Sequence, residues 1–215
     1  MAFRNGIFVA VANVGTSRVM TSLDGITWTH VTVALSSWWS ITFGNGIFVA
    51  VAMSGTNKVM TSSDGITWTP VAAPATVGEL RHVTYGGGLF IAVARSGTNR
   101  VMTSPDGVTW TPRTVQLSVW NKVVFGNGLF VAVANDGVNR VMTSPDGITW
   151  TPVAVNTVSW LGVVFGNGLF VAVAENGLNR LMYPLDGSIW YYKSIPESNW
   201  RNVIYVEDMF IALLS

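Results

Sequence analysis

Short apolar runs separated by turn-forming residues recur along the whole chain at a regular spacing. The spacing is clearest in one phenylalanine column, whose members lie 40, 42, 40, 40 and 40 residues apart: Phe8, Phe48, Phe90, Phe130, Phe170 and Phe210. Such self-similarity indicates one supersecondary unit that is repeated and stacks on its neighbours. The repeat therefore determines the fold, and single motifs are interpreted within it.

Each repeat contains four short runs rich in Val, Ile, Phe, Thr and Trp, which is a strand pattern and not a helical period. In the fourth repeat we expect strands at 120–125, 129–134, 140–143 and 148–151. Gly-Asn-Gly joins the first two strands, and Asn-Gly supplies the positive φ values that a tight hairpin needs. The second strand, Phe-Val-Ala-Val-Ala, is apolar on both faces, so we expect it to be buried between neighbouring sheets.

Repeated four-stranded antiparallel sheets predict an all-β protein, a single β-propeller domain over residues 1–215. We place the repeats at about 1–37, 38–79, 80–119, 120–159 and 160–199, with a partial repeat at 200–215. The extra two residues of the second repeat lie between Trp68 and Tyr85, where we expect a loop. The partial repeat holds only a first and a second strand. Six blades are therefore slightly favoured over five, in which the C-terminal strands would replace part of the first blade.

Composition excludes several classes of protein. Apolar residues make up 49% of the chain and charged residues 11%, which excludes disorder. The longest apolar runs are far shorter than the roughly 20 residues of a membrane-spanning helix, and no signal peptide is visible. Twelve basic and eleven acidic side chains give a net charge of +1, so we expect neither nucleic acid nor a membrane as partner. The chain has no cysteine, hence no disulfide or thiolate zinc site, and its compartment is left open.

A second motif recurs once in each of the five full repeats. Residues 22–28 read Ser-Leu-Asp-Gly-Ile-Thr-Trp, and the pattern returns at 62–68, 104–110, 144–150 and, less well kept, at 184–190. An Asp before Gly commonly hydrogen-bonds the backbone of its own turn. The pattern resembles the Asp-box, or BNR repeat, of sialidase-like propellers. The resemblance implies a structural turn between the third and fourth strands, away from the ligand face, for Asp24, Asp64, Asp106, Asp146 and Asp186.

Catalysis is not expected from this resemblance. Phe3-Arg4 is similar to the start of the arginine motif of sialidases, but Asn5 and Gly6 follow it. Five of the eleven acids are turn aspartates, which leaves too few for a glycosidase carboxyl pair. His30 and His82 occupy unrelated repeat positions, with no nucleophile or metal ligand in phase. We therefore expect no enzyme, no metal and no cofactor.

One rim of the predicted propeller carries the candidate binding residues. The loop from the fourth strand to the next blade and the turn between the second and third strands should share a face. A tryptophan ring can cover a sugar while amide and cationic groups bind its hydroxyls. The predicted ligand-binding residues are Trp38, Trp120, Trp160, Trp200, Asn57, Lys58, Asn99, Arg100, Asn139, Arg140, Asn179 and Arg180. The alternative is that the tryptophans pack between blades and the Asn-Arg pairs cap their turns.

The sequence predicts a multivalent, lectin-like β-propeller that binds glycans at repeated shallow sites. The alternative function is a structural or adhesion module, such as a component of a phage tail or surface assembly, that binds a protein partner or assembles with itself. Residues just after the tryptophan column differ between repeats, for example Trp39-Ser40 and Arg81-His82. A lectin requires equivalent sites, whereas a protein-binding rim would be dominated by one blade, such as the one with Arg81 and His82.

Overall fold

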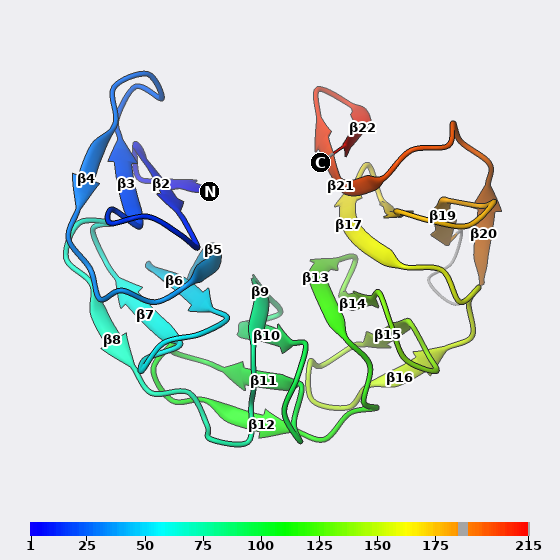
Figure 1. Ribbon diagram of the computed structural model, residues 1–215, viewed down its shortest axis with the longest axis horizontal. Helices are drawn as coiled ribbons and strands as arrows, with labels where there is room; N and C mark the ends of the chain where they lie inside the picture. Colours follow the sequence, from blue (N-terminus) through cyan, green and yellow to red (C-terminus); the bar gives the residue numbers. More distant parts are fainter. Residues whose placement is uncertain (185–188, 215) are drawn as a thin grey trace. The chain divides into compact units, whose positions relative to one another are not determined.

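The computed structural model describes residues 1–184 and 189–214, and every regular element in these residues is a β-strand (Figure 1). No helix in these two ranges is long and apolar enough to cross a membrane. The chain divides into two compact units, Met1–Thr114 and Val115–Ser215, which are described one at a time. The expected single domain over residues 1–215 stays a prediction.

The N-terminal unit contains three four-stranded antiparallel sheets whose strands follow one another in chain order. Sheet 1 consists of β1 (Ala2–Arg4), β2 (Ile7–Val11), β3 (Val19–Ser22) and β4 (Thr29–Val31). Sheet 2 consists of β5 (Trp38–Gly44), β6 (Ile47–Ala52), β7 (Val59–Ser62) and β8 (Thr69–Val71). Sheet 3 consists of β9 (Leu80–Gly86), β10 (Leu89–Ala94), β11 (Val101–Ser104) and β12 (Thr111–Arg113).

The C-terminal unit contains two four-stranded sheets and one strand pair. Sheet 4 consists of β13 (Trp120–Gly126), β14 (Leu129–Ala134), β15 (Val141–Ser144) and β16 (Thr151–Val153). Sheet 5 consists of β17 (Trp160–Gly166), β18 (Leu169–Ala174), β19 (Leu181–Pro184) and β20 (Trp190–Lys193). The terminal hairpin consists of β21 (Trp200–Val206) and β22 (Met209–Leu214). The all-β prediction of five full blades and a partial one is confirmed in the described residues.

The predicted hairpin turns are confirmed, and the glycine before each Asn-Gly pair has a packing reason. Asn45 and Gly46 have φ values of 45° and 82°, as the tight turn requires. Gly44 has no such φ, but an added Cβ would lie 2.0 Å from Cγ of Tyr85 on the next sheet. Gly166 and Tyr205 repeat this contact in the C-terminal unit, at 2.1 Å. Gly-Asn-Gly therefore serves both the turn and the close approach of the following sheet.

Consecutive sheets pack through two chemically different faces. In sheet 1, one face carries Val9, Val19 and Val31, and this valine face packs on Phe48 and Met60 of sheet 2. We call the opposite surface, which carries the phenylalanine of the second strand and the methionine of the third, the phenylalanine face. The same contact joins sheets 2 and 3, sheets 4 and 5, and sheet 5 and the terminal hairpin. The second strands of sheets 2 and 5 are buried because both of their faces are covered in this way.

The fourth strand begins three residues later than predicted. In sheet 4 it starts at Thr151, because the preceding residues belong to the turn and not to the ladder. The N–H groups of Ile148 and Thr149 both donate to Oδ1 of Asp146, at 2.8 Å. Trp150 Nε1 donates to the carbonyl of Gly147 at 3.0 Å. Side-chain hydrogen bonds therefore hold these residues in the turn, and strand pairing starts only after them in the sequence.

The aspartate turn is the same in the four repeats where it is described. In sheet 3, Asp106 Oδ1 accepts hydrogen bonds from the N–H groups of Val108 and Thr109 and from Ser104 Oγ, at 2.8, 2.7 and 2.9 Å. The Thr109 N–H is the main reason that the pKa of Asp106 is lowered to about 2. Asp24 and Asp64 show the same pKa, and the pKa of Asp146 is also lowered. Asp186 lies outside the described residues.

We predict that Asp106→Ala lowers the free energy of unfolding, because three donors lose their acceptor. The pKa of this carboxyl is depressed in the folded state, so its contribution is complete above the ordinary value of 3.8 and is lost as pH falls toward 2. Urea unfolding of both proteins should show a difference at pH 7 that shrinks between pH 4 and 2. Glu79→Ala, which removes an exposed carboxylate, is the control. Equal stability at pH 7 would contradict the prediction.

Candidate functional site

The loops that the sequence assigned to one rim are hydrogen-bonded to each other. In sheet 2, Met53 N donates to Ser37 O at 2.9 Å and Ser37 N donates to Ser54 O at 3.0 Å. The opposite edge carries the other turns, where Asn45 Nδ2 donates to Pro105 O at 3.2 Å. We define the N-terminal rim as residues 12–18, 32–39, 53–58, 72–82 and 95–100. The C-terminal rim is residues 115–122, 135–140, 154–162, 175–180 and 194–202.

The tryptophan column lies mostly inside the protein. Trp38, Trp120 and Trp160 are exposed by 1% or less, and each indole N–H donates to a carbonyl four residues earlier, at 3.1 to 3.2 Å. Trp200 is half-buried and makes the same bond to Pro196 O at 2.9 Å. The three buried rings offer no face to a sugar. We therefore assign them to packing, the alternative that the sequence left open.

The basic residue of each Asn-Lys/Arg pair donates hydrogen bonds to backbone carbonyls of its own rim. Arg100, Arg140 and Arg180 each donate from Nε to the carbonyl of the turn glycine three residues earlier, at 3.4, 3.3 and 2.7 Å. Lys58 Nζ instead donates to the carbonyls of Val77 and Gly78, at 3.3 and 3.0 Å. These contacts fit the turn-capping alternative.

The asparagines of these pairs are half-buried. Asn99 Nδ2 donates to Arg113 O at 3.2 Å, and Asn139 Nδ2 donates to Gln116 Oε1 at 2.5 Å. The carbonyl of Asn57 accepts Ser36 Oγ at 2.9 Å, and Asn179 occupies the equivalent position in sheet 5. Glycan binding by this column stays a prediction.

A β-bulge at the start of each inner strand of sheets 2 to 5 and of the hairpin produces the variable surface. The register shifts between Trp38 and Ser40 in sheet 2, and at the equivalent place in the others. A bulge leaves one residue outside the regular alternation and redirects its side chain. The bulged residues are Trp39, Arg81, Asn121, Leu161 and Arg201. Sequence reasoning noted that these positions vary but did not include Trp39 or Arg81 in the site.

Trp39 and Arg81 meet on the N-terminal rim. The Trp39 side chain is 41% exposed, and the guanidinium carbon of Arg81 lies 3.9 Å from its ring centroid, which is a cation–π contact. Arg81 Nη1 also lies 3.3 Å from Met53 Sδ. Two adjacent sheets thus present an aromatic ring, a cation and a thioether together.

The two rims differ in charge. The N-terminal rim carries five basic residues and one acid: Arg18, Lys58, Arg81, Arg95, Arg100 and Glu79. The C-terminal rim carries four basic residues and three acids, and all three acids form ion pairs at 3.7 to 4.0 Å: Asp136 with Arg140, Glu175 with Arg201 and Glu197 with Arg180. The N-terminal rim is therefore the more positive surface.

The remaining basic group of the C-terminal rim is enclosed. Lys122 Nζ donates to Asn202 Oδ1 at 2.6 Å, across two sheets. Sheet 5, which lies between sheet 4 and the hairpin in the sequence, has Gly162 at the equivalent position. An added Cβ there would lie 2.9 Å from Asn202 Cα. Burial lowers the pKa of Lys122 to about 8. Neighbouring Asn121 is 8% exposed, and its Nδ2 donates to Trp160 O at 3.4 Å.

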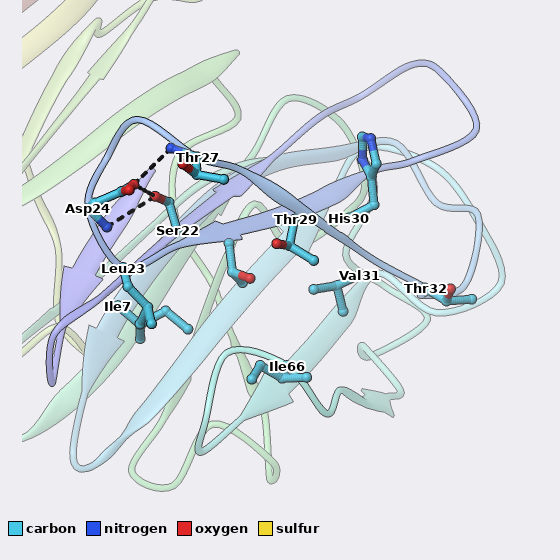
Figure 2. A pocket seen from close by; sticks show the side chains of 11 residues that line it. Ile7, Ser22, Leu23, Asp24, Thr27, Thr29, His30, Val31, Thr32 and Ile66 are labelled. Atoms are coloured by element: carbon cyan, nitrogen blue, oxygen red, sulfur yellow. Dashed lines mark hydrogen bonds between the residues drawn. The ribbon is translucent and has the colours of Figure 1, made fainter.

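A cavity of about 710 Å³ lies along the outer strand of sheet 1, from the aspartate turn to Thr32 (Figure 2). Ile7, Val31 and Ile66 provide apolar walls, while Asp24 and His30 lie near its two ends. Its volume falls in the range of ligand cavities, roughly 300–1,000 Å³. Asp24 Oδ1, however, already accepts hydrogen bonds from its own turn. In residues 1–184 and 189–214, no group of three or more His, Asp or Glu side chains is placed to hold a metal ion.

The sequence profile of the DUF6242 beta propeller domain matches residues 72–206, more than half of the chain. The chain belongs to this family. A search of curated proteins finds no match for this DUF6242 propeller. The β-propeller prediction is thus confirmed.

Solved structures show the same fold at low sequence identity. Virginiamycin B lyase from Staphylococcus aureus aligns with a TM-score of 0.77 and 14% identity, over 96% of this chain and 76% of the lyase. A nidogen/laminin complex aligns with a TM-score of 0.70 and 10% identity, over 96% and 84% of the two chains. YCF48 bound to D1 peptide aligns with a TM-score of 0.66 and 16% identity, over 95% and 69%. At these identities the likeness shows the fold alone.

We predict that Lys122 makes the free energy of unfolding of the DUF6242 propeller vary with pH in the alkaline range. Its folded pKa of about 8 lies below its ordinary 10.5, so the unfolded state binds more protons between these values. The free energy of unfolding should therefore rise across this interval. Lys122→Met, which has a similar length and no charge, should lack this part of the rise. Urea unfolding at several pH values between 7 and 10.5 measures the difference, and parallel curves for the two proteins would refute it.

Proposed function

We propose that this DUF6242 propeller is a non-enzymatic binding module that holds an acidic segment of a protein partner on its N-terminal rim. The observation that carries the proposal is the Trp39–Arg81 pair, which two strand bulges place on the surface. Tryptophan and arginine are the side chains most enriched among the residues that dominate binding energy in protein interfaces. The proposal takes the protein-binding alternative that the sequence left open.

The charge of the N-terminal rim supports an acidic partner. This rim has five basic residues and one acidic residue, whereas the aspartate turns occupy the opposite edge of the same unit. Such a surface accelerates the encounter with a negatively charged segment, and the effect weakens as salt screens it. Apolar side chains of the segment would contact the Trp39 ring and Met53, while its carboxylates would face Arg81.

Structural neighbours support the protein-binding proposal by analogy only. One is YCF48 bound to D1 peptide and another belongs to a nidogen/laminin complex, whereas the virginiamycin B lyases are enzymes. The fold therefore accommodates both binding and catalysis, and the function has to be inferred from the side chains of the site. In our proposal the turn aspartates are structural Asp-box residues. Their low pKa supports this role, since such carboxylates stay ionised at neutral pH and are poor proton donors.

Multivalent glycan binding receives less support. It needs equivalent aromatic platforms, yet three of its four predicted rings are exposed by 1% or less. Trp39 is a ring to which a sugar could still stack, but its position varies between the repeats. A carbohydrate ligand is therefore the competing outcome in the experiment that follows.

We predict that acidic peptides lose affinity when the Trp39–Arg81 pair is removed. A random peptide library is selected on the immobilised protein, and the enriched peptides are then measured by fluorescence anisotropy. Trp39→Ala and Arg81→Gln should each weaken binding roughly 30-fold or more, as expected for residues that dominate an interface. Ile26→Ala is the control, because Ile26 is 85% exposed on the opposite edge.

The same proteins are titrated with a panel of mono- and oligosaccharides. Enriched peptides without acidic residues, or equal affinity in all variants, would refute the proposed site. A saturable response to a sugar that Trp39→Ala abolishes, together with no peptide enrichment, would establish the glycan alternative. Affinity for an acidic peptide should also fall as the salt concentration rises.

A further inference from the structure

The outer strand of sheet 1 differs from the other outer strands of its unit at the central residue. In sheets 2, 3 and 4 this residue is a proline opposite the methionine of the third strand: Pro70, Pro112 and Pro152. In β4 the same register places His30 opposite Met20. In sheet 5 it is Tyr192, whose hydroxyl accepts the N–H of Asn156 at 2.8 Å. Proline on a sheet edge prevents another strand from pairing there, and β4 lacks this protection.

The backbone of His30 points away from the neighbouring strand β3. Proline has no N–H, so it fits in a ladder only at a residue whose N–H side faces away from the partner strand. The register of sheet 1 is the same, and Thr29 and Val31 make the hydrogen bonds to β3. His30 therefore directs its N–H and its C=O to the side of β4 where sheet 1 has no further strand. Such a pair of groups can exchange two hydrogen bonds with an added strand.

The cavity of about 710 Å³ lies along this same strand. Its lining includes Thr29 and Val31 of β4 together with the apolar side chains of Ile7 and Ile66, and the His30 ring points away from Ile66 (Figure 2). Successive side chains of a strand point to opposite sides of the sheet. Every second side chain of a strand added beside β4 would therefore enter the cavity.

We propose that β4 binds an extended peptide segment as a further strand of sheet 1. In this mode backbone hydrogen bonds supply affinity, and pockets for alternate side chains supply specificity. The apolar walls favour Val, Ile or Leu at every second position of the segment. Asp24, whose pKa is lowered to about 2 chiefly by the N–H of Thr27, lies near one end of the cavity as a carboxylate. A Lys or Arg of the segment complements it there.

This site is separate from the Trp39–Arg81 pair and takes a different segment. Neither Trp39 nor Arg81 lines the cavity, and every residue that does belongs to the first two repeats of the N-terminal unit. The N-terminal rim is proposed to hold an acidic segment, whereas the edge of β4 takes a basic segment of alternating pattern. The inference therefore goes beyond the proposed function, and either can fail without the other.

Two pairs of variants separate the backbone from the side chains. His30→Pro removes the outward N–H with the residue that three other sheets carry there, so the protein should still fold, which circular dichroism checks. His30→Ala is its matched control, because it removes the imidazole and keeps the N–H. Ile66→Gln makes one cavity wall polar. Its control is Ile26→Gln, because Ile26 has the same turn position in sheet 1, is 85% exposed and does not line the cavity.

A random peptide library is selected on the immobilised wild-type protein, after removal of the peptides that bind His30→Pro. The enriched peptides should alternate apolar and polar residues and contain Lys or Arg. In fluorescence anisotropy, their affinity should fall roughly 10-fold or more in His30→Pro, which leaves a ladder group unpaired. It should fall roughly 5-fold in Ile66→Gln, which loses apolar contact. His30→Ala, Ile26→Gln and Trp39→Ala should bind like the wild type.

N-methylated peptides test the same hydrogen bonds without changing the protein. In an added strand, only every second N–H points toward β4. N-methyl groups on one alternating set of residues should therefore abolish binding, whereas N-methyl groups on the other set should be tolerated. Equal effects of the two sets would contradict an added strand.

Three further results would overturn the proposal. The selection could enrich no peptide with a Kd below roughly 100 µM. His30→Ala could weaken binding as much as His30→Pro, which would make the imidazole and not the backbone the recognised group. Sedimentation velocity could show a wild-type dimer that His30→Pro abolishes, with no peptide enriched, which would assign the edge to a second copy of the chain.

Discussion

The packing of one sheet's valine face on the next sheet's phenylalanine face is the interaction on which the rest of the structure depends. Each sheet has only four short strands and cannot bury both of its surfaces alone, so its stability comes from its neighbours. The contact also sets the local constraints. Gly44 has to be a glycine because Tyr85 of the following sheet lies against it, and the aspartate turn has to hold the outer strand without a fifth strand beside it.

This dependence explains why the fold could be predicted from the sequence. Residues that serve the inter-sheet contact are repeated, since consecutive sheets within each unit pack through the same pair of faces. The phenylalanine column, the Gly-Asn-Gly turns and the apolar second strand all repeat at a period of about 40 residues, and each was placed correctly. The start of the fourth strand was misplaced for a local reason. Ile148 and Thr149 have strand-forming side chains, but Asp146 accepts their backbone N–H groups and keeps them in the turn.

The binding surface was less predictable, because repetition does not distinguish scaffold from site. Trp38, Trp120 and Trp160 recur in register, and a recurring exposed ring and a recurring core ring look alike in sequence. A bulge follows each of them, and one extra residue in a strand leaves no pattern in the sequence. The sequence feature that indicated the site was variation between repeats. Trp39 and Arg81 stand at the position that differs most between repeats, just after a column that hardly changes.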